Sequence, residues 1–431
     1  MLTNMKIVKD NIPYKVNLKD KTVLVYDDGS FIELAIRLIG HFKKVLYYCP
    51  YKEEYIQSSK YRIGTGIPGL TRVEEFFEII NEVDLFIFPG INEGDLQEHL
   101  ISLGKRVFGS RHGDDIEINR VDTHKYFKKK GFDSNELKEI VGLDNLLRYL
   151  KDKEDLFIKM GKFRGTFQTK QFINFDLHAN YFKDLAVELG NEAPYMKFIV
   201  ETPIKDCIEI GYDGFCIDGK FPNKSIFGYE IKDAGYACTV KDYKDLPQQM
   251  LDTNEALAPI LAEAQYKNYL SYENRLNKKE NYVLDICARR GIPPGELMDE
   301  MILNTPEVLW FGSEGIIINP IIEAKFGIEI MTYSPFATKN WVTVEFPEKL
   351  RNHYKFKNLT KIEGKYCVIP SESKGTAIGA VVAWGNTLEG AIEKVKEYIT
   401  ELKGEEIEAK IGSISDIWNT IAEGEKMGIK F

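Results

Sequence analysis

Short runs of β-branched and aromatic residues alternate with helical patterns in the first third of the chain. After the first strand, Ser30 is predicted to cap a helix that ends near Gly40. Strands are predicted at Thr22–Tyr26, Lys44–Tyr48, 84–88 and 105–108. Strands separated by helices favour a mainly parallel, doubly wound sheet. Ligands bind such sheets at the carboxyl ends of the strands, which points to residues 27–30 and 89–96.

The pattern changes from about Asp122, and the rest of the chain predicts an α+β arrangement. A charged helix, a leucine-rich helix, a strand, a helix and a strand are expected in turn at 123–130, 137–150, Leu156–Met160, 177–189 and Lys197–Glu201. Two short strands, a helix and an apolar strand are expected next, at 207–212, 214–217, 254–270 and 282–288. Asp218 and Gly219 are expected to form a hairpin turn. The end of the chain predicts strands and a helix at 365–369, 378–383 and 387–402.

Composition narrows the class of protein. The 431 residues are 44% hydrophobic, enough for several domains. The 57 Lys and Arg residues against 66 Asp and Glu residues give a net charge of −9, which argues against a nucleic-acid partner because phosphate binding needs a basic surface. Six cysteines without a CxxC pair are typical of a reduced, cytoplasmic protein. We expect no signal peptide, because the opening residues lack an apolar segment, and no membrane association, because no run reaches roughly 18 apolar residues.

Two acidic residues carry the strongest chemical signal. Glu273 precedes Asp285 by twelve residues, with the polar, turn-like segment 274–281 between them. If the flanks are antiparallel strands, the two carboxylates face each other and suit Mg²⁺. Arg289, four residues later, could hold a transferring phosphoryl group. The spacing alone fits an ordinary surface hairpin as well, but Asp285 lies in an apolar run, where a carboxylate needs a partner.

Cations and a strand end complete the candidate site. Lys159 lies at the end of an apolar strand, just before a loop with two glycines whose N–H groups could bind phosphates. This loop, 161–166, does not match the Walker motif. Lys125, on an earlier helix, offers a second cation, although most single lysines are solvated. Glu201 ends another strand, where exposed backbone groups could hold adenine, and Glu209 could accept hydrogen bonds from a ribose.

These segments occur in the order found in ATP-grasp ligases, and the chain resembles phosphoribosylamine–glycine ligases along most of its length. VLVYDDGSFIELAIRLIG and DLFIFPGINEGDLQEHLISLGKRVFG resemble the opening strand-turn-helix units of that family, and EINRVDTHKYFKKKGF resembles its phosphate-lysine helix. FIKMGKFRGTF resembles its second lysine and glycine lid, and FIVETPI with IEIGYDGFCIDG resembles its hinge and ribose strand. YVLDICARRGIPPGE and KGTAIGAVVAWGNTLEGAIEKVKEYI resemble its metal strand and C-terminal domain.

The resemblance implies a role for each candidate residue. Lys125 and Lys159 would bind ATP phosphates, and Arg289 and Lys159 would act in catalysis. Adenosine would be bound by Glu201, Pro203, Ile204 and Glu209, and Mg²⁺ or Mn²⁺ by Glu273 and Asp285. The implied domains are an N-terminal domain, an ATP-grasp domain with a lid and a small α+β domain, at 1–120, 121–325 (lid about 121–200) and 326–431. A small carboxylate and an amine would be joined through an acyl phosphate, by a monomer or a homodimer.

The chain also departs from the family pattern. Cys287 stands where the metal strand usually has asparagine, and a thiol is a poor Mg²⁺ ligand. Asp27 and Asp28 occupy a turn that is otherwise rich in glycine, where their charge would repel a phosphate. The segment 230–240 replaces a long substrate loop. Two alternatives therefore stay open: a ligase for another acid and amine, or a non-catalytic ATP-binding scaffold or sensor. A nicotinamide dehydrogenase is disfavoured because no GxGxxG follows the first strand.

Overall fold

The computed structural model describes residues 14–50, 61–160, 169–371 and 376–431. The chain groups into two compact units. The first unit comprises Met1–Asp115, Glu209–Asn274 and Leu284–Phe431, and the second comprises Ile116–Ile208 and Arg275–Val283. The predicted division into three domains stays a prediction. Over the described ranges, no helix is long and apolar enough to cross a membrane.

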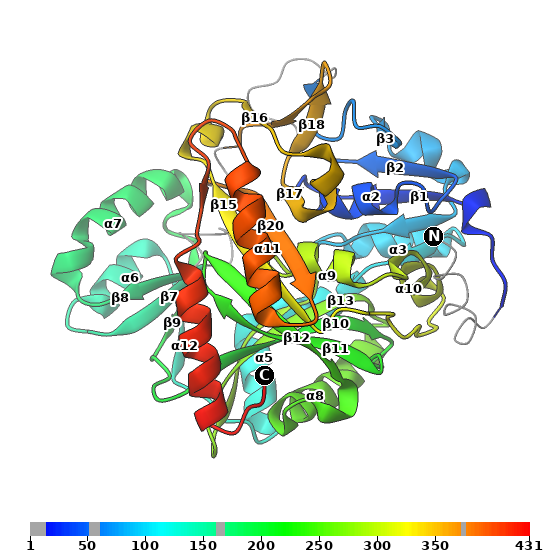
Figure 1. Ribbon diagram of the computed structural model, residues 1–431. Coiled ribbons are helices and arrows are strands. Elements are labelled where there is room, and N and C mark those ends of the chain that lie inside the picture. The colour runs from blue at the N-terminus through cyan, green and yellow to red at the C-terminus, as the bar shows by residue number, and fades with distance from the viewer. Residues whose placement is uncertain (1–13, 51–60, 161–168, 372–375) are drawn as a thin grey trace. The chain divides into compact units, whose positions relative to one another are not determined.

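The first unit begins with a five-stranded parallel sheet, as predicted (Figure 1). Its order is β3-β2-β1-β4-β5, with bounds Leu70–Val73, Lys44–Tyr48, Thr22–Tyr26, Leu85–Ile87 and Arg106–Phe108. The sequence pattern missed β3, because Thr71 and Arg72 interrupt its apolar residues. Helices α2 (Ile32–Leu38) and α3 (Gly94–Ser102) follow β1 and β4. Burial of Val23, Leu24 and Val25 on β1 is complete, as expected for a strand in the middle of such a sheet.

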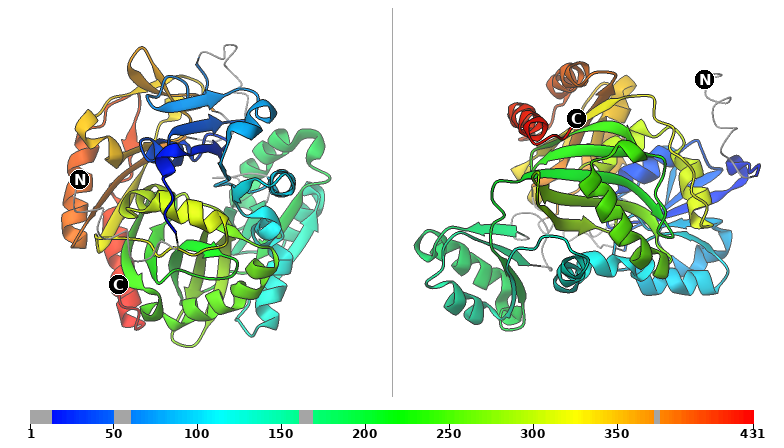
Figure 2. Two further views of the ribbon diagram at one scale, coloured as in Figure 1. Left: turned by 90° about the vertical axis from the view of Figure 1, so that its right-hand side faces the viewer. Right: turned by 90° about the horizontal axis from the view of Figure 1, so that it is seen from below.

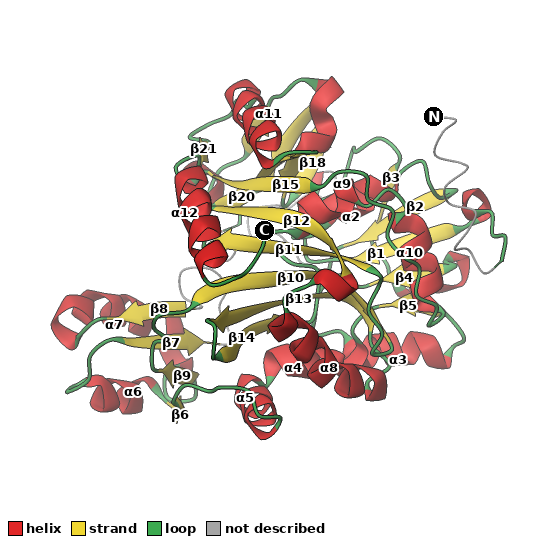
Figure 3. Ribbon diagram, turned by 60° about the horizontal axis from the view of Figure 1, so that its bottom comes forward, coloured by secondary structure: helices red, strands yellow, loops and turns green. Residues whose placement is uncertain are grey.

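The largest sheet has nine strands, and we name it the central sheet (Figure 3). Its path is β14-β13-β10-β11-β12-β15-β20-β17, and β21 (Glu408–Ala409) pairs with β15. In path order the bounds are Asn281–Cys287, Lys267–Leu276, Ile208–Ile217, Lys224–Ile231, Gly235–Asp242, Phe326–Tyr333, Ala377–Gly385 and Tyr354–Phe356. Helices α11 (Leu388–Glu401) and α12 (Ser413–Lys426) pack on one face of this sheet, against β15 and β20 and against β11 and β12 (Figure 2).

Shorter elements complete the first unit. Helices α8 (Gln248–Glu263), α9 (Gly295–Met301) and α10 (Thr305–Ser313) lie between strands of the central sheet along the chain. The 3₁₀ turn η10 (Glu348–His353) leads directly into β17. A separate antiparallel sheet has the order β16-β19-β18, with bounds Val342–Val344, Lys365–Val368 and Leu359–Ile362.

The second unit is a small α+β body. Its sheet has the order β6-β9-β7-β8, with antiparallel pairs and bounds Leu137–Val141, Lys197–Glu201, Leu156–Met160 and Thr169–Phe172. Its helices are α4 (Asp115–Ile118), α5 (Arg120–Lys129), α6 (Leu143–Leu150) and α7 (Phe175–Leu189). Buried leucines of α6 pack with Phe172, Phe182 and Phe198 in one core.

Four local predictions were wrong. The two short strands expected at 207–212 and 214–217 form one continuous strand, β10. The helix expected at 137–150 is a strand, β6, followed by α6, because Gly142 has a φ of +89° and separates them. The helix expected at 254–270 ends at Glu263, and its last part belongs to β13. Ser30 does not cap α2. The Asp27 carboxylate accepts the N–H of Phe31 instead, at 3.0 and 3.1 Å.

Candidate active site

Four neighbouring strands of the central sheet each contribute a carboxylate to one cluster. Along the path β14-β13-β10-β11 these are Asp285, Glu273, Glu209 and Glu230, which we name the acidic cluster. Strands β10 and β11 pair Gly211 with Gly228, and the same register continued places Glu209 opposite Glu230. Two further acids therefore lie beside the predicted pair Glu273 and Asp285. Glu209 was predicted as a site residue, and Glu230 was not.

The acidic cluster occupies the face of the sheet opposite to α12. Tyr229 stacks on Phe431, with ring centroids 5.5 Å apart. The charge of Glu425 on α12 contributes to the raised pKa of Tyr229, so the Tyr229 side chain lies on the side of α12. Because successive side chains of a strand alternate, Glu230 points to the other face. The acids predicted to bind a metal therefore lie on the face opposite to α12.

Burial and the neighbouring carboxylates favour the protonated forms of Glu230 and Glu273. Burial and the neighbouring Glu209 raise the pKa of Glu230 to about 8. Burial, Glu209, Glu230 and Asp285 raise the pKa of Glu273 well above its usual range, and Glu230 and Glu273 are hydrogen-bonded. A hydrogen bond between two carboxyl groups needs a proton, so the pair shares one near neutral pH.

The donor chemistry of the acidic cluster fits a hard divalent cation. Among the residues that the structure describes, no group of three or more His, Cys, Asp or Glu side chains is arranged to hold a metal ion. Mg²⁺, however, usually takes only one or two carboxylates and completes its shell with water and substrate phosphates. Glu273 and Asp285, on adjacent strands, meet that requirement once Glu273 has released its proton.

Arg289 follows the end of β14 and is half-buried. Its guanidinium donates to the carbonyl of Arg290 at 3.2 Å and to the sulfur of Cys287 at 3.8 Å. Cys287, on the predicted metal strand, thus contacts the arginine predicted to bind a phosphoryl group.

A polar network lies on the same strands and was not predicted. Asp213 of β10 is buried and accepts hydrogen bonds from the hydroxyls of Ser271 and Tyr236. Tyr236 reaches Asp213 across Gly228, where an added Cβ would come within 2.2 Å of the Tyr236 hydroxyl oxygen. Only glycine leaves room for this crossing, so the network depends on Gly228. Burial raises the pKa of Asp213 to about 6, although both hydroxyls oppose the shift.

Replacing Asp213 with asparagine should change how stability depends on pH. Because the folded pKa exceeds the unfolded value, Asp213 contributes stability at low pH that is lost as the pH rises through about 6. The free energy of unfolding that depends on this proton decreases by about 2–3 kcal/mol between about pH 4 and pH 6. Urea unfolding of Asp213→Asn across this range should show a smaller decrease than the wild type. The exposed Asp245→Asn serves as a control, and equal slopes in all three proteins would contradict the assignment.

The second unit holds the predicted lysine and hinge residues. On β7, Lys159 is buried, and its Nζ lies 3.2 Å from Oε2 of Glu201 on β9. Pro203 and Ile204 follow β9 and are half-buried, and Arg275 donates to the Ile204 carbonyl at 3.1 Å. A buried lysine next to a carboxylate is held in place rather than solvated, unlike most lysines.

Lys125 is placed differently. It lies on α5 with a side chain 64% exposed, and its Nζ pairs with Asp122 at 3.0 Å. An ion pair at such exposure contributes little to stability. The phosphate-binding role of Lys125 stays a prediction. The glycine loop 161–166 lies outside the described residues.

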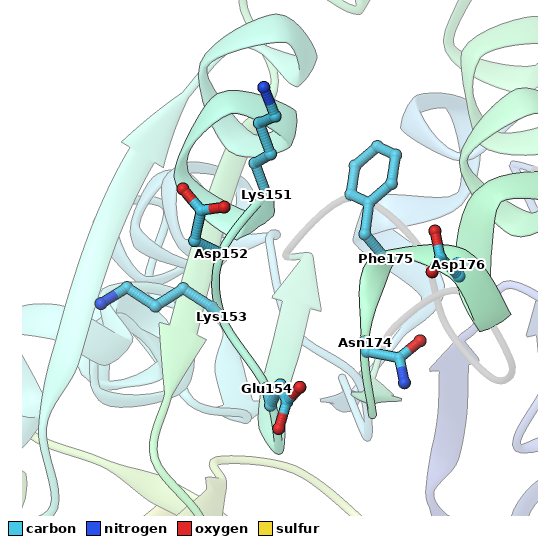
Figure 4. A pocket seen from close by; sticks show the side chains of 7 residues that line it. All are labelled: Lys151, Asp152, Lys153, Glu154, Asn174, Phe175 and Asp176. Atoms are coloured by element: carbon cyan, nitrogen blue, oxygen red, sulfur yellow. The ribbon is translucent and has the colours of Figure 1, made fainter.

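A hollow of about 490 Å³ in the second unit is separate from these residues (Figure 4). Lys151, Asp152, Lys153 and Glu154 line one side and Asn174, Phe175 and Asp176 the other. None of the nine predicted site residues lines it. Its wall of mixed, unfocused charge lacks the few converging polar groups on an apolar surface that are typical of a binding site.

Comparison with known proteins supports the fold. No protein-family model and no curated protein matches the sequence. The structure resembles a phosphoribosylamine–glycine ligase from Thermotoga maritima, with a TM-score of 0.67 and 15% identity over 90% of this chain and 99% of that one. It also resembles a biotin carboxylase from Campylobacter jejuni, with a TM-score of 0.62 and 13% identity over 93% and 97%. An L-amino acid ligase from Bacillus licheniformis matches with a TM-score of 0.56 and 12% identity over 90% of this chain and 98% of that one. The ATP-grasp fold predicted from the sequence is thereby confirmed.

Proposed function

We propose that this protein is an ATP-dependent ligase that joins a small carboxylate to an amine through an acyl phosphate. The observation that carries this proposal is the convergence of Glu209, Glu230, Glu273 and Asp285 on one face of the central sheet. Four carboxylates that repel one another are costly unless a cation binds there. Support also comes from the fold, which is shared with a phosphoribosylamine–glycine ligase and an L-amino acid ligase.

Within this proposal, Glu273 and Asp285 would hold Mg²⁺, or Mn²⁺. When bound, the ion would polarise the ATP phosphates. Arg289 and Lys159 would offset negative charge as the γ-phosphoryl group moves to the carboxylate, and Lys125 would add a further positive charge. The adenosine would contact the residues predicted for it, Glu201, Pro203, Ile204 and Glu209. Attack of the amine on the acyl phosphate then gives the amide, ADP and phosphate.

The substrate pair decides between two versions of this proposal. Glycine with phosphoribosylamine is one candidate, supported by the resemblance in fold. Another amino acid with a different amine is the second, favoured by the departures at Asp27, Asp28 and 230–240. In the structure Asp27 is buried and accepts hydrogen bonds from Phe31 and Tyr47, so this turn is organised around a carboxylate rather than open to a phosphate.

The test is release of ADP from Mg·ATP by the full chain. One reaction contains glycine and phosphoribosylamine, and a panel pairs each amino acid with simple amines and peptides. We expect turnover with one pair and none without an amine acceptor. Absence of ADP release across the whole panel would contradict the ligase proposal.

A non-catalytic ATP-binding scaffold or sensor is the second candidate. The observation that favours it is Cys287, which stands at a metal-strand position and contacts Arg289. Calorimetry with Mg·ATP separates the two candidates: a scaffold binds the nucleotide and forms no ADP with any substrate pair. The assembly state, a monomer or a homodimer, stays a prediction that sedimentation of the full chain would test.

Replacing Lys159 with methionine should weaken ATP binding about tenfold, the usual value of a hydrogen bond to a charged group. The substitution keeps the apolar stem and leaves Glu201 without its partner at 3.2 Å. Calorimetry with an ATP analogue measures the effect. Lys197→Met, on the same sheet and 71% exposed, is the matched control. Equal affinities of the two variants would rule out a phosphate contact for Lys159.

A further inference from the structure

A second hollow lies in the first unit, at the C-terminal end of α2. It measures about 230 Å³, and its polar lining comes from α2 and the residue after the following turn, from α9 and from η10 with β17. The polar residues are Arg37, His41, Glu300, Arg351, Asn352 and Lys355. None of them belongs to the predicted nucleotide site. We name this hollow the α2 pocket.

Positive charge exceeds negative charge around the α2 pocket. Glu300 accepts from Lys355 Nζ at 2.6 Å and lies 3.6 Å from Arg37 Nε. Glu33, buried behind the pocket, accepts from Arg351 at 2.9 Å and lies 3.7 Å from Lys355. Three cations therefore share two carboxylates. All five side chains are at most 16% exposed, so water screens the remaining positive charge only weakly.

One buried donor of the α2 pocket is left for a ligand. Within the described residues, Nε of Arg351 is buried and has no hydrogen-bond partner. Arg37 donates from Nε to the Asp299 carbonyl at 3.2 Å and faces His41 Nε2 from Nη1 at 3.1 Å. Burial, Arg37 and Lys19 lower the pKa of His41, so its ring is neutral at neutral pH and accepts from Arg37. Asn352 adds an exposed amide at the rim.

The place of the α2 pocket in the fold separates it from the predicted site. Helix α2 starts just after the carboxyl end of β1, the edge where parallel sheets bind ligands. Arg37 and His41 lie at the opposite end of α2 and beyond it. A ligand in the α2 pocket would therefore bind near the C-terminal end of α2, away from the carboxyl ends of the strands of the N-terminal sheet.

We propose that the α2 pocket binds a small oxyanion, a carboxylate or a phosphate, through Arg37, Arg351 and Asn352. An oxyanion balances the unmatched positive charge, and its oxygens suit the planar fork of a guanidinium. The volume admits a compact ion or a metabolite of a few carbon atoms. Glu300 and Glu33 hold the cations in place and exclude a larger negative charge. This inference is independent of the proposed ligase activity.

Calorimetry on the full chain without nucleotide tests this site. Inorganic phosphate is the first probe and succinate the second, and together they distinguish phosphate from carboxylate recognition. We expect at least one probe to bind with a dissociation constant on the order of 1 mM or lower. Arg37→Ala should weaken that binding about tenfold or more, because it removes a charged donor. Arg62→Ala, whose arginine pairs with Glu74 outside the pocket, should leave binding unchanged.

Two further variants make the test decisive. Asn352→Asp adds a negative charge at an exposed position without touching the ion pairs, so it should fold normally and weaken the same probe. Arg289→Ala removes a cation of the predicted nucleotide site and should not affect the probe. The proposal fails if neither probe gives saturable binding. It also fails if binding survives both Arg37→Ala and Asn352→Asp, or if Arg289→Ala abolishes it, since the anion then binds at the nucleotide site.

Discussion

The variant Asp285→Ala should release ADP from Mg·ATP about a thousandfold more slowly than the wild type, a loss of about 4 kcal/mol in transition-state stabilisation. Asp285 lies on β14, next to β13 with Glu273, and it contributes to the raised pKa of that residue. Without it, the acidic cluster offers the metal a poorer set of ligands. We therefore also expect the Mg²⁺ concentration for half-maximal turnover to increase. The measurement is initial ADP release as a function of Mg²⁺ with the best substrate pair.

Two comparisons separate a metal ligand from a merely structural acid. Asp285→Asn keeps the size of the side chain and should also lose activity, while thermal unfolding shows whether the sheet is intact. Asp242→Ala removes an exposed acid at the end of β12 and should retain full turnover. Full activity in Asp285→Ala would show that this residue binds no essential metal.

A second large effect is expected at Arg290, which directly follows Arg289 but has a different environment. Its side chain is fully buried and lies 2.7 Å from Asp299 Oδ2 and 3.2 Å from Glu296 Oε1. Burial opposes the charge, yet Asp299 and Glu296 outweigh it and raise the pKa of Arg290. Replacing Arg290 with methionine should cost about 3–5 kcal/mol of stability, since two buried carboxylates lose their partner.

The same variant should respond to pH in a specific direction. Burial already raises the pKa of Asp299. Without the guanidinium, which lowers the pKa of Asp299, that carboxyl is more easily protonated in the folded state, so the variant gains stability as the pH falls. The difference from the wild type should therefore be larger at pH 8 than at pH 5. Arg62→Met, at a partly exposed pair with Glu74, should cost less than about 1 kcal/mol. Similar losses in the two variants would contradict this view of Arg290.

Local sequence patterns predicted every strand of the N-terminal sheet except β3, but in the C-terminal region they predicted only β19, β20 and α11. Runs such as Thr22–Tyr26 and Lys44–Tyr48 are apolar on both faces, so their burial in a parallel sheet follows from composition. The pattern failed at 137–150, where leucine spacing fits a helix but a glycine with positive φ breaks it. It also failed at 254–270, where the aromatic residues near Tyr269 belong to a strand of the central sheet.

The candidate site was predicted only in part. Asp285 was identified because a carboxylate in an apolar strand needs a partner, and Glu273 because of its spacing from Asp285. Glu230 has the same signal, an acid after the apolar residues of β11, but its partner lies on a strand distant in sequence. The sequence contains no local signal for Asp213, because its network depends on Gly228 leaving room for Tyr236. Register between strands brings these groups together, and periodicity does not specify register.

The sequence by itself determined that this protein is a multidomain α/β chain, where several of its strands lie, and that two acids and an arginine occur at spacings suited to nucleotide chemistry. Only the tertiary structure decided that four carboxylates share one face of a sheet, that Lys159 pairs with Glu201, and that three cations surround the α2 pocket. The physical reason is range. Propensity and periodicity act over a few neighbouring residues, whereas burial and charge interaction depend on segments that are joined only when the sheets form.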